Sequence, residues 1–257
     1  MPQIPADYDL YDYKKYWSGR AYEHESETIA IKQLLKLIKR NNLDILEIGA
    51  GFGRLVPIYK HKAKSITLLE PSNKLINIAK KDLSSDQITF IHSDVQQLYS
   101  KTKSHFDFII MVRVLHHIKD PKKVFEIINQ RLKPDGYLLL EFANKEHAIA
   151  TVRSIFQGNL TFRWDIFPID IRSKKNIRKD SIAFYNFHPD DIYKLIDTTG
   201  FKIIQKRSVS NFRNRHIKKL VPLKFLIHLE KALQRQLATH KWGPSVFLLA
   251  QKTSSKD

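Results

Sequence analysis

A glycine-rich turn between two apolar runs constrains the fold of this chain more than any other feature. The stretch LDILEIGAGFGRLV (43–56) places three glycines within five residues, with apolar residues on both sides. This pattern predicts a buried strand, a tight turn and the start of a helix. Such a turn offers free backbone N–H groups and the positive end of a helix to a ligand. We therefore expect a ligand to lie against Gly49, Gly51 and Gly53.

Strands and helices alternate on both sides of this turn. The core strands are predicted over 43–48, 65–70, 87–94, 106–114 and 137–143, and the helices over 25–40, 53–62, 72–83 and 120–132. Ser72 and Asp120 are the expected N-caps, Pro57 and Pro121 fit the first helical turn, and 133–136 is a turn. The alternation predicts an α/β fold with a parallel sheet and helices on both faces.

The regular alternation stops after residue 143. Residues 144–187 are basic and aromatic without a clear period, and a stretch of this length predicts a lid or binding loop. The pattern returns with a helix over 188–200, strands over 201–209 and 245–252, and a basic amphipathic helix over 215–237. We expect four parts: an N-terminal lid and leading helix (1–42), a ligand-binding core (43–143), a substrate-cap insertion (144–187) and the C-terminal part of the fold (188–257).

Composition and charge narrow the class of protein. Cysteine is absent, which excludes disulfides and thiolate metal sites, and the N-terminal residues lack the pattern of a signal peptide, so a cytoplasmic protein is expected. The net charge is +18, with 22 Lys/Arg against 17 Asp/Glu in 1–142 and 22 against 9 in 143–257. This excess fits an anionic partner such as nucleic acid, a phosphorylated metabolite or an anionic membrane. The alternative is a lysine-rich surface without such a partner.

Three carboxylates at predicted strand ends indicate the ligand. The dinucleotide spacing Gly-x-Gly-x-x-Gly would need glycine at Arg54, so the turn alone does not decide between ligand classes. Glu47 suits a ligand ammonium, Glu70 can accept both hydroxyls of a ribose, and Asp94 can accept from an adenine amino group beside the N–H of Val95. A ligand with an amino-acid end, a ribose and an adenine satisfies all three.

This ordered set resembles the class I S-adenosylmethionine-dependent methyltransferases. LDILEIGAGFGR, LLEPS (68–72) and HSDVQQL (92–98) are similar to the first three motifs of the family. The stretch FDFIIMVRVLHHIKDPKKVFEIINQRLKPDGYLLLE (106–141) is similar to the branch that includes the quinone-biosynthesis methyltransferases. The resemblance covers 40–143 well and 188–209 and 245–252 more loosely. It implies a Rossmann-like seven-stranded, mostly parallel sheet with an antiparallel last strand, S-adenosylmethionine as cofactor and no metal.

The resemblance also implies roles for residues of this chain. Those that would surround the methionine end are Glu47, Gly49, Ala50, Gly51 and Gly53. Those that would hold the adenosine are Glu70 on the ribose and Pro71, Ser72, Asp94 and Val95 around the adenine. Met111, Val112 and Arg113 would lie under the sulfonium. Arg113 departs from the small or polar residue common there, so it binds the cofactor carboxylate, an acidic substrate or a salt-bridge partner elsewhere.

The expected lid lies in the stretch 11–25. Its candidates are Tyr16, Trp17, Arg20 and Tyr22, with Arg20 and Tyr22 reaching the cofactor and Trp17 the substrate. The alternative is that these aromatics anchor the leading helix on the core.

The catalytic and substrate-binding candidates lie after the fourth strand and in the cap. We expect one of His116 and His117, His116 more than His117, to act as a base or to contact the substrate. The alternative is that the pair packs the strand end. The candidates for substrate contact in and beside the cap are Phe162, Arg163, Trp164, Tyr185 and His188; the same residues equally suit a small apolar core.

These observations predict an enzyme that transfers a methyl group from S-adenosylmethionine to an O, N or C nucleophile of a small molecule or lipid precursor. The basic helix over 215–237 suits peripheral contact with an anionic membrane. One alternative is an RNA methyltransferase that uses the basic second half, although no RNA-binding module is recognisable. The others are a cofactor-binding homologue without activity and, for the glycine turn alone, a nicotinamide dehydrogenase.

Overall fold

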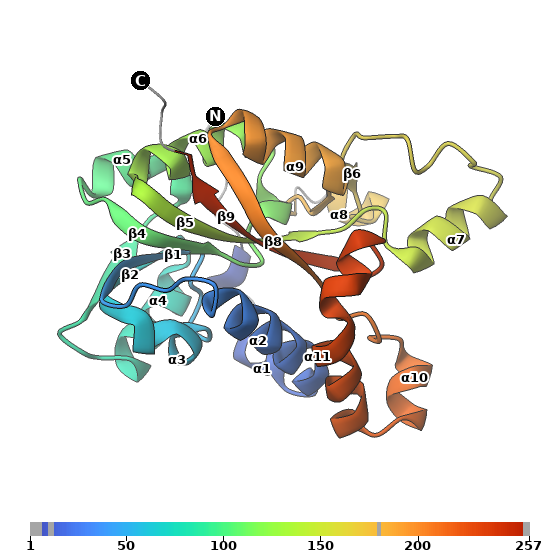
Figure 1. Cartoon of the computed structure of the whole chain (residues 1–257), viewed down its shortest axis with the longest axis horizontal. Coiled ribbons are helices and arrows are strands. Elements are labelled where there is room, and N and C mark those ends of the chain that lie inside the picture. Colours follow the sequence, from blue (N-terminus) through green and yellow to red (C-terminus); the bar gives the residue numbers. More distant parts are fainter. Residues whose placement is uncertain (1–6, 10–12, 179–180, 254–257) are drawn as a thin grey trace.

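A seven-stranded sheet forms the centre of the molecule (Figure 1). The computed structural model describes residues 7–9, 13–178 and 181–253. The strands follow the order β3-β2-β1-β4-β5-β9-β8. All neighbours pair in parallel except that β9 runs antiparallel to both β5 and β8. This is the α/β fold, mostly parallel with an antiparallel last strand, that the sequence predicts.

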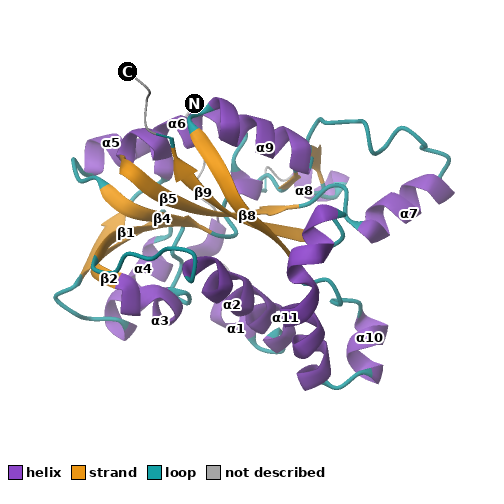
Figure 2. Cartoon of the chain, in the orientation of Figure 1, coloured by secondary structure: helices purple, strands orange, loops and turns teal. Residues whose placement is uncertain are grey.

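Helices cover both faces of the sheet, as Figure 2 shows. The strands are β1 (Leu43–Ile48), β2 (Ala63–Glu70), β3 (Ile88–His92), β4 (Phe106–Met111), β5 (Leu132–Ala143), β8 (Phe201–Val209) and β9 (Ser245–Lys252). One apolar core joins the sheet to α5 (Leu98–Lys101), α6 (Pro121–Arg131) and α9 (Pro189–Thr198). The other joins it to α2 (Ala21–Leu35), α3 (Val56–Tyr59) and α4 (Asn73–Asp82). The strands of the sheet centre are apolar on both sides because both faces are covered.

The local signals in the sequence operate as predicted at several helix starts. The Ser72 hydroxyl accepts from the N–H of Leu75 and the Asp120 carboxylate from that of Lys123, which caps α4 and α6. The helix predicted over 53–62 is shorter, since α3 has a single turn and continues as a 3₁₀ turn over Lys60–Lys62. The leading helix begins and ends about five residues earlier than predicted.

The sequence predicts one helix over 215–237, and this prediction is wrong because the structure has two helices there. Pro222 separates α10 (Arg215–Leu220) from α11 (Leu223–Thr239), because a proline has no N–H to continue the hydrogen-bond ladder. α11 packs against β8 and α2. Between α2 and α11 the Tyr22 hydroxyl donates to the buried carboxylate of Glu230.

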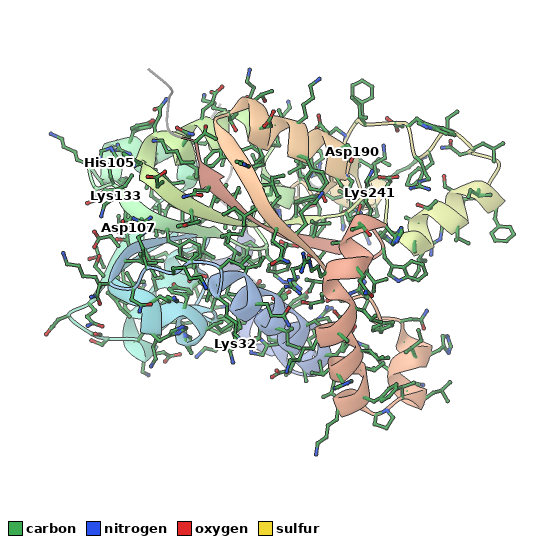
Figure 3. The ribbon with its side chains drawn as sticks, in the orientation of Figure 1. Lys32, His105, Asp107, Lys133, Asp190 and Lys241 are labelled. Atoms are coloured by element: carbon green, nitrogen blue, oxygen red, sulfur yellow. The ribbon has the colours of Figure 1, made fainter. Side chains whose placement is uncertain are left out.

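The predicted turn over 133–136 lies inside the range of β5. The register with β4 shifts there, so Phe106 faces Leu132 while Phe108 faces Tyr137. The Lys133 ammonium lies 2.6 Å from the carboxylate of Asp44 in β1 and 2.8 Å from that of Asp107 in the neighbouring strand β4, which fixes the irregular part of β5. In Figure 3, Lys133 and Asp107 are labelled at the left-hand end of the molecule, whereas Asp190 and Lys241 are labelled to the right of its centre.

The insertion between β5 and α9 contains short elements rather than one irregular loop. They are α7 (Ala148–Phe156), β6 (Ile169–Asp170), α8 (Lys174–Arg178) and β7 (Tyr185–Asn186), of which β6 and β7 pair antiparallel. We call residues 144–187 the cap. Positions 179–180 of the cap, 1–6 and 10–12 of the predicted N-terminal lid, and 254–257 lie outside the described residues.

Within the described part of the chain, no helix combines the length and apolar composition needed to cross a membrane.

Replacing a fully buried side chain of β9 tests the packing of the sheet. Phe247 has no exposed surface, so Phe247→Ala is expected to lower the free energy of unfolding by about 3–5 kcal/mol. Phe225→Ala, at an exposed position of α11, is the control and should change it by less than about 0.5 kcal/mol. Urea denaturation measures both, and equal losses would contradict this assignment of the core.

Candidate active site

The glycine turn lies at the carboxyl end of β1, where parallel sheets bind ligands. Gly49, Gly51 and Gly53 all have left-handed φ angles, between +57° and +77°. A Cβ at Gly49 would lie 2.2 Å from a methyl carbon of Val114, so only glycine fits there. A Cβ at Gly51 would meet only the ring of Tyr13, at 3.6 Å. The backbone of Gly51 is therefore the part of the turn that the N-terminal segment covers directly.

Glu70 holds this turn from the end of β2. Its two carboxylate oxygens accept from the N–H of Gly51 at 2.7 Å and from the N–H of Ser72 at 2.8 Å. Burial raises the pKa of Glu70 to about 6, although the two backbone N–H donors oppose the shift. An ionised carboxylate has about four acceptor positions, so two remain for further donors.

Glu47 lies beside the turn as a buried carboxylate at the end of β1. The Tyr59 hydroxyl donates to it at 2.6 Å. Burial is the main cause that raises the pKa of Glu47 to about 7. A buried carboxylate with one neutral donor gains stability when a cationic group approaches, because the ionised form is then compensated.

Two arginines beside the turn share one buried carboxylate. Glu27 of α2 lies 2.7 Å from the guanidinium of Arg54 and 2.5 Å from that of Arg113. Both guanidinium groups lie over the ring of Trp17, at 3.6 and 4.7 Å from its centroid. The two cations lower the pKa of Glu27 although burial raises it, and they keep the carboxylate charged. The unusual Arg113 of the sequence is thus a salt-bridge residue beside the predicted sulfonium position.

The backbone of Arg113 is also held in an uncommon conformation. Its φ is +61°, in the left-handed region that a long side chain seldom adopts. Its N–H donates to the buried carboxylate of Glu141 at 2.8 Å, and the Ser245 hydroxyl donates to the other oxygen of that carboxylate. Glu141 therefore fixes the loop that follows β4.

The N-terminal segment covers the turn more closely than the sequence predicts. Asp9 accepts from the Ser72 hydroxyl at 2.6 Å and from the N–H of Lys74, and the rings of Tyr8 and Tyr13 lie 5.4 Å apart. The cavity left at the turn measures about 20 Å³, and its lining is Tyr13, Glu47, Gly49, Ala50, Gly51, Phe52, Arg54, Leu55, Val112 and Arg113. That volume admits about one water molecule. A nucleoside-sized ligand therefore requires Tyr13, whose ring lies over Gly51, to move.

The histidine pair after β4 has different surroundings at its two members. The Nδ1–H of His117 donates to the carbonyl of Ala183 at 2.8 Å, so Nε2 is the acceptor for the Tyr8 hydroxyl at 2.6 Å. His116 is buried and stacks on Phe184 with ring centroids 4.2 Å apart. Burial lowers the pKa of both rings. This geometry favours His117 over His116 as a proton acceptor, the reverse of the order expected from the sequence.

The remaining cofactor candidates differ in their burial and in their hydrogen-bond partners. Ser72 is buried at the start of α4, whereas the Asp94 carboxylate accepts from the N–H of Gln97 and caps a 3₁₀ turn that begins at Val95. The carbonyl of Pro71 accepts from the His92 ring. Met111 is fully buried in the core at the end of β4. Val112 lines the cavity.

One lid candidate, Tyr22, points away from the glycine turn. The Tyr22 hydroxyl lies between α2 and α11, where it contacts Glu230 and the N–H of Phe212. The Arg20 guanidinium lies 4.0 Å from the ring centroid of Tyr16. Trp17 and Tyr16 both contact residues that line the cavity, since Trp17 lies against Arg54 and Arg113 and Tyr16 stacks on Tyr13.

The substrate candidates of the cap fall into three groups. Trp164 is exposed, and Tyr185 packs at the edge of a core cluster beside Phe187. Arg163 forms an ion pair with Glu146 at 2.9 Å and its carbonyl accepts from His188. The ring of Phe162 lies under the ammonium of Lys145.

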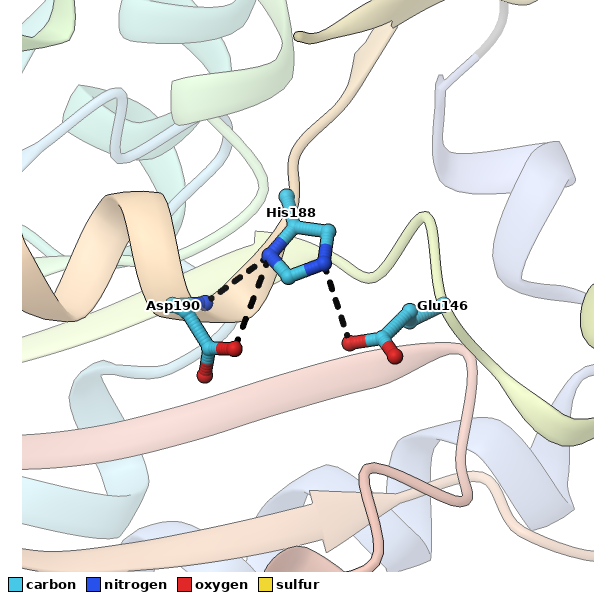
Figure 4. Close-up of side chains that lie close together, drawn as sticks. All are labelled: Glu146, His188 and Asp190. Carbon is cyan, nitrogen blue, oxygen red and sulfur yellow. Dashed lines mark hydrogen bonds and ion pairs between the residues drawn. The ribbon is translucent and has the colours of Figure 1, made fainter. Parts of the chain in front are cut away.

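His188 belongs to a cluster at the base of the cap (Figure 4). Its ring lies between Glu146 and Asp190, and ligand-type atoms of the three residues lie within 4.8 Å of one another. The Lys241 ammonium lies 2.7 Å from the Glu146 carboxylate and 2.6 Å from that of Asp190. A cation of the chain itself already pairs with these carboxylates, so the cluster links the cap, α9 and the loop between α11 and β9.

The sequence motifs do not include four residues that contact the site: Glu27, Glu141, Tyr8 and Asp9. Glu27 and Glu141 are buried acids on predicted apolar elements, and such positions are a recognisable signal because acids are seldom buried without partners. Tyr8 and Asp9 gave no signal, since their partners lie 109 and 63 residues away.

Comparison with known proteins identifies the class. A family model described as a methyltransferase domain matches residues 22–206 of the chain. The chain therefore belongs to this family, and with its fold and glycine turn it is a class I S-adenosylmethionine-dependent methyltransferase.

Individual relatives differ in what they act on. The chain is 26% identical over 223 residues to the tRNA 5-carboxymethoxyuridine methyltransferase of Escherichia coli K12, covering 84% of this chain and 82% of that protein. It is 33% identical over 96 residues to the demethylmenaquinone methyltransferase of Chlamydia pneumoniae, covering 37% and 41%. It also superposes with a TM-score of 0.61 and 13% identity on the 1,6-didemethyltoxoflavin-N1-methyltransferase of Burkholderia thailandensis, covering 96% and 86%. At that identity the superposition shows the shared fold.

The pH dependence of stability tests the burial of Glu47. Its raised pKa means that, between pH about 4.5 and 7, the folded chain keeps a proton that the unfolded chain has lost, so its contribution to stability falls as pH rises. Glu47→Gln removes this loss and should stabilise the chain by about 2–3 kcal/mol at pH 8, and by much less at pH 5. Urea denaturation at the two pH values measures the difference. Exposed Glu126→Gln is the control, and an equal effect at both pH values would contradict the assignment.

Proposed function

We propose that this chain transfers a methyl group from S-adenosylmethionine to an O, N or C nucleophile of a small molecule or lipid precursor. The observation that supports it best is the set of groups at the carboxyl ends of β1 and β2: a glycine turn whose residues have left-handed φ angles, a buried Glu47 and a buried Glu70. These groups match an amino acid and a ribose without any provision for phosphate.

The donor's parts fit the polar groups of the site. In this proposal Glu47 compensates the ammonium of the methionine end, the free acceptor positions of Glu70 receive the ribose hydroxyls, and Asp94 and Val95 lie beside the adenine. Arg54 and Arg113 stand beside the methionine carboxylate. Tyr13 must first leave the turn, because the cavity that it helps to line is far smaller than the donor.

When bound, S-adenosylmethionine supplies an electrophilic methyl group that needs no further activation. The chain's task is to hold the acceptor in line behind that methyl and exclude water, which contributes up to roughly 7–11 kcal/mol. His117 is the proposed base, since its Nε2 already accepts from the hydroxyl of Tyr8. An acceptor hydroxyl in the place of the Tyr8 hydroxyl would give its proton to Nε2 as the oxygen–carbon bond forms and the sulfur–carbon bond breaks.

An RNA acceptor is the second candidate. The relative that acts on tRNA covers more of this chain than the menaquinone relative, and the chain carries a net charge of +18. Against it, the cap exposes large aliphatic and aromatic side chains, which do not suit a phosphate backbone.

The first experiment is transfer of labelled methyl from S-adenosylmethionine into fractionated cell extract. Label in small metabolites or the organic fraction that resists nuclease supports the proposal and yields a mass for the acceptor. Label that nuclease removes assigns the chain to RNA instead. Absence of transfer, together with no stabilisation by S-adenosylhomocysteine in a thermal melt, would contradict both.

Removing the carboxylates tests the placement of the adenosine. Glu70→Ala is expected to weaken S-adenosylhomocysteine binding by about tenfold or more, because a charge-assisted pair of hydrogen bonds is lost, and Asp94→Ala by less. Calorimetric titration measures both, with exposed Asp86→Ala as the control and NAD as a ligand that should not bind. Unchanged affinity in both variants would exclude this placement.

Removing the base tests the role of His117. His117→Ala should lower the rate of methyl transfer about 10²–10⁴-fold if the acceptor must lose a proton. Tyr8→Phe breaks the same hydrogen bond without removing the base, so its rate should stay near that of the unaltered chain. Since burial lowers the pKa of His117, the activity should also persist at pH values where an ordinary histidine becomes protonated. Equal losses in the two variants would indicate a structural role.

A further inference from the structure

Helix α7 is folded with its apolar side outward. Ile149, Val152, Ile155 and Phe156 recur at helical spacing along one side, and all four are exposed. On the other side Ser154 is buried and Thr151 half-buried. A helix of a globular domain normally buries its apolar stripe and exposes its hydroxyl side. The reversed orientation therefore indicates that something outside the chain covers the apolar side.

The exposure continues through the cap. Phe156 is 87% exposed, Trp164 76% and Phe167 74%, values at which aromatic rings contact mainly solvent. Large apolar patches of this kind mark sites of interaction with proteins, membranes or ligands. Figure 1 shows α7 and α10 projecting from the same end of the molecule. On α10 and the start of α11, Leu220 and Phe225 are exposed as well.

The charges around these side chains are mostly positive. The cap carries eight Lys/Arg against four Asp/Glu, and the stretch 213–224 carries five Lys/Arg and no acid. Exposed aromatic and aliphatic residues among cations match a bilayer surface with anionic lipids, in which the rings enter the acyl boundary and the cations meet the headgroups.

The same charges disfavour a second copy of the chain. A two-fold contact through this face would bring two basic surfaces together without compensating acids. The aliphatic members of the α7 stripe also give RNA nothing to stack on, since stacking requires flat rings.

We propose that the exposed side of α7, with Trp164, Phe167 and the cations of α10, is a docking surface for an anionic membrane. Docking does not depend on methyl transfer. Its consequence for the acceptor does rest on the function proposed above: β7 of the cap leads directly from Phe184, which stacks on His116, so the docked cap would hold the acceptor side of the site near the lipid.

Vesicle flotation with the full chain tests the proposal. Vesicles of phosphatidylcholine alone and vesicles with about one third phosphatidylglycerol are compared at low and high salt. Binding is expected on the anionic vesicles, with weaker binding at high salt because headgroup attraction is screened. Failure to bind anionic vesicles at low salt would overturn the proposal.

Two combined variants separate the apolar and charged contributions. Phe156→Ser/Trp164→Ser/Phe167→Ser should reduce vesicle binding at least tenfold, and Leu37→Ser/Ile204→Ser, exposed apolar residues outside the cap, is its control. Arg215→Gln/Lys219→Gln/Lys224→Gln should reduce binding about fivefold for each cation at the surface, with Lys80→Gln/Lys81→Gln as its control. Vesicle binding unchanged in the aromatic variant would overturn the proposal.

Further measurements on the same variants distinguish the other partners. A tRNA mixture bound by the unaltered chain but not by the aromatic variant, or a dimer in sedimentation that this variant abolishes, would assign the surface to RNA or to a second copy and overturn membrane docking. Thermal stabilisation by S-adenosylhomocysteine, measured in parallel, reports on the proposed function. This stabilisation should remain in both variants. Membrane docking and cofactor binding are thus measured separately, so the failure of one proposal can be told from the failure of the other.

Discussion

The carboxylate of Glu70 is the interaction on which the site depends. It accepts from the backbone of Gly51 and of Ser72, and so ties the glycine turn after β1 to the start of α4 after β2. The backbone of its own turn or helix offers neither N–H a hydrogen-bond acceptor. The carboxylate thus shapes the backbone that faces the ligand before any ligand arrives, and it keeps acceptor capacity on the same side.

The described residues of the N-terminal segment contact groups that the proposed function assigns to the donor and the acceptor. Asp9 takes the Ser72 hydroxyl, Tyr13 covers Gly51, and the Tyr8 hydroxyl takes Nε2 of His117. These contacts give hydrogen-bond partners to polar groups that would otherwise line an empty cavity. The free energy of opening the segment is consequently subtracted from the affinity for the donor.

The sequence predicts the core of the fold well because its signals are local. Ser72 and Asp120 cap the helices they precede, and the strand over 201–209 is found as predicted, since apolar period and capping depend on neighbouring residues. The signals fail where distant segments decide. The apolar stripe across 215–237 continues past the break at Pro222, and Glu230, the carboxylate partner of Tyr22, lies on α11. The predicted cap boundaries and cofactor contacts remain predictions.

The two coverings of the site differ in how they are attached. Lys145 at the base of the cap is buried and donates to the carbonyls of Asp165 and Phe167, while Glu146 next to it binds Arg163 and Lys241. Backbone hydrogen bonds also tie the base of the cap to the sheet, since Phe187 donates to the carbonyl of Ala143 in β5. Tyr8 and Tyr13 instead reach His117 and Gly51 through their side chains. In the proposed function Tyr13 lies over the donor side of the site and Tyr8 over the acceptor side. A movement that frees both tyrosines would then expose both sides at once, so exchange of spent donor and release of product would share one step whose rate limits turnover.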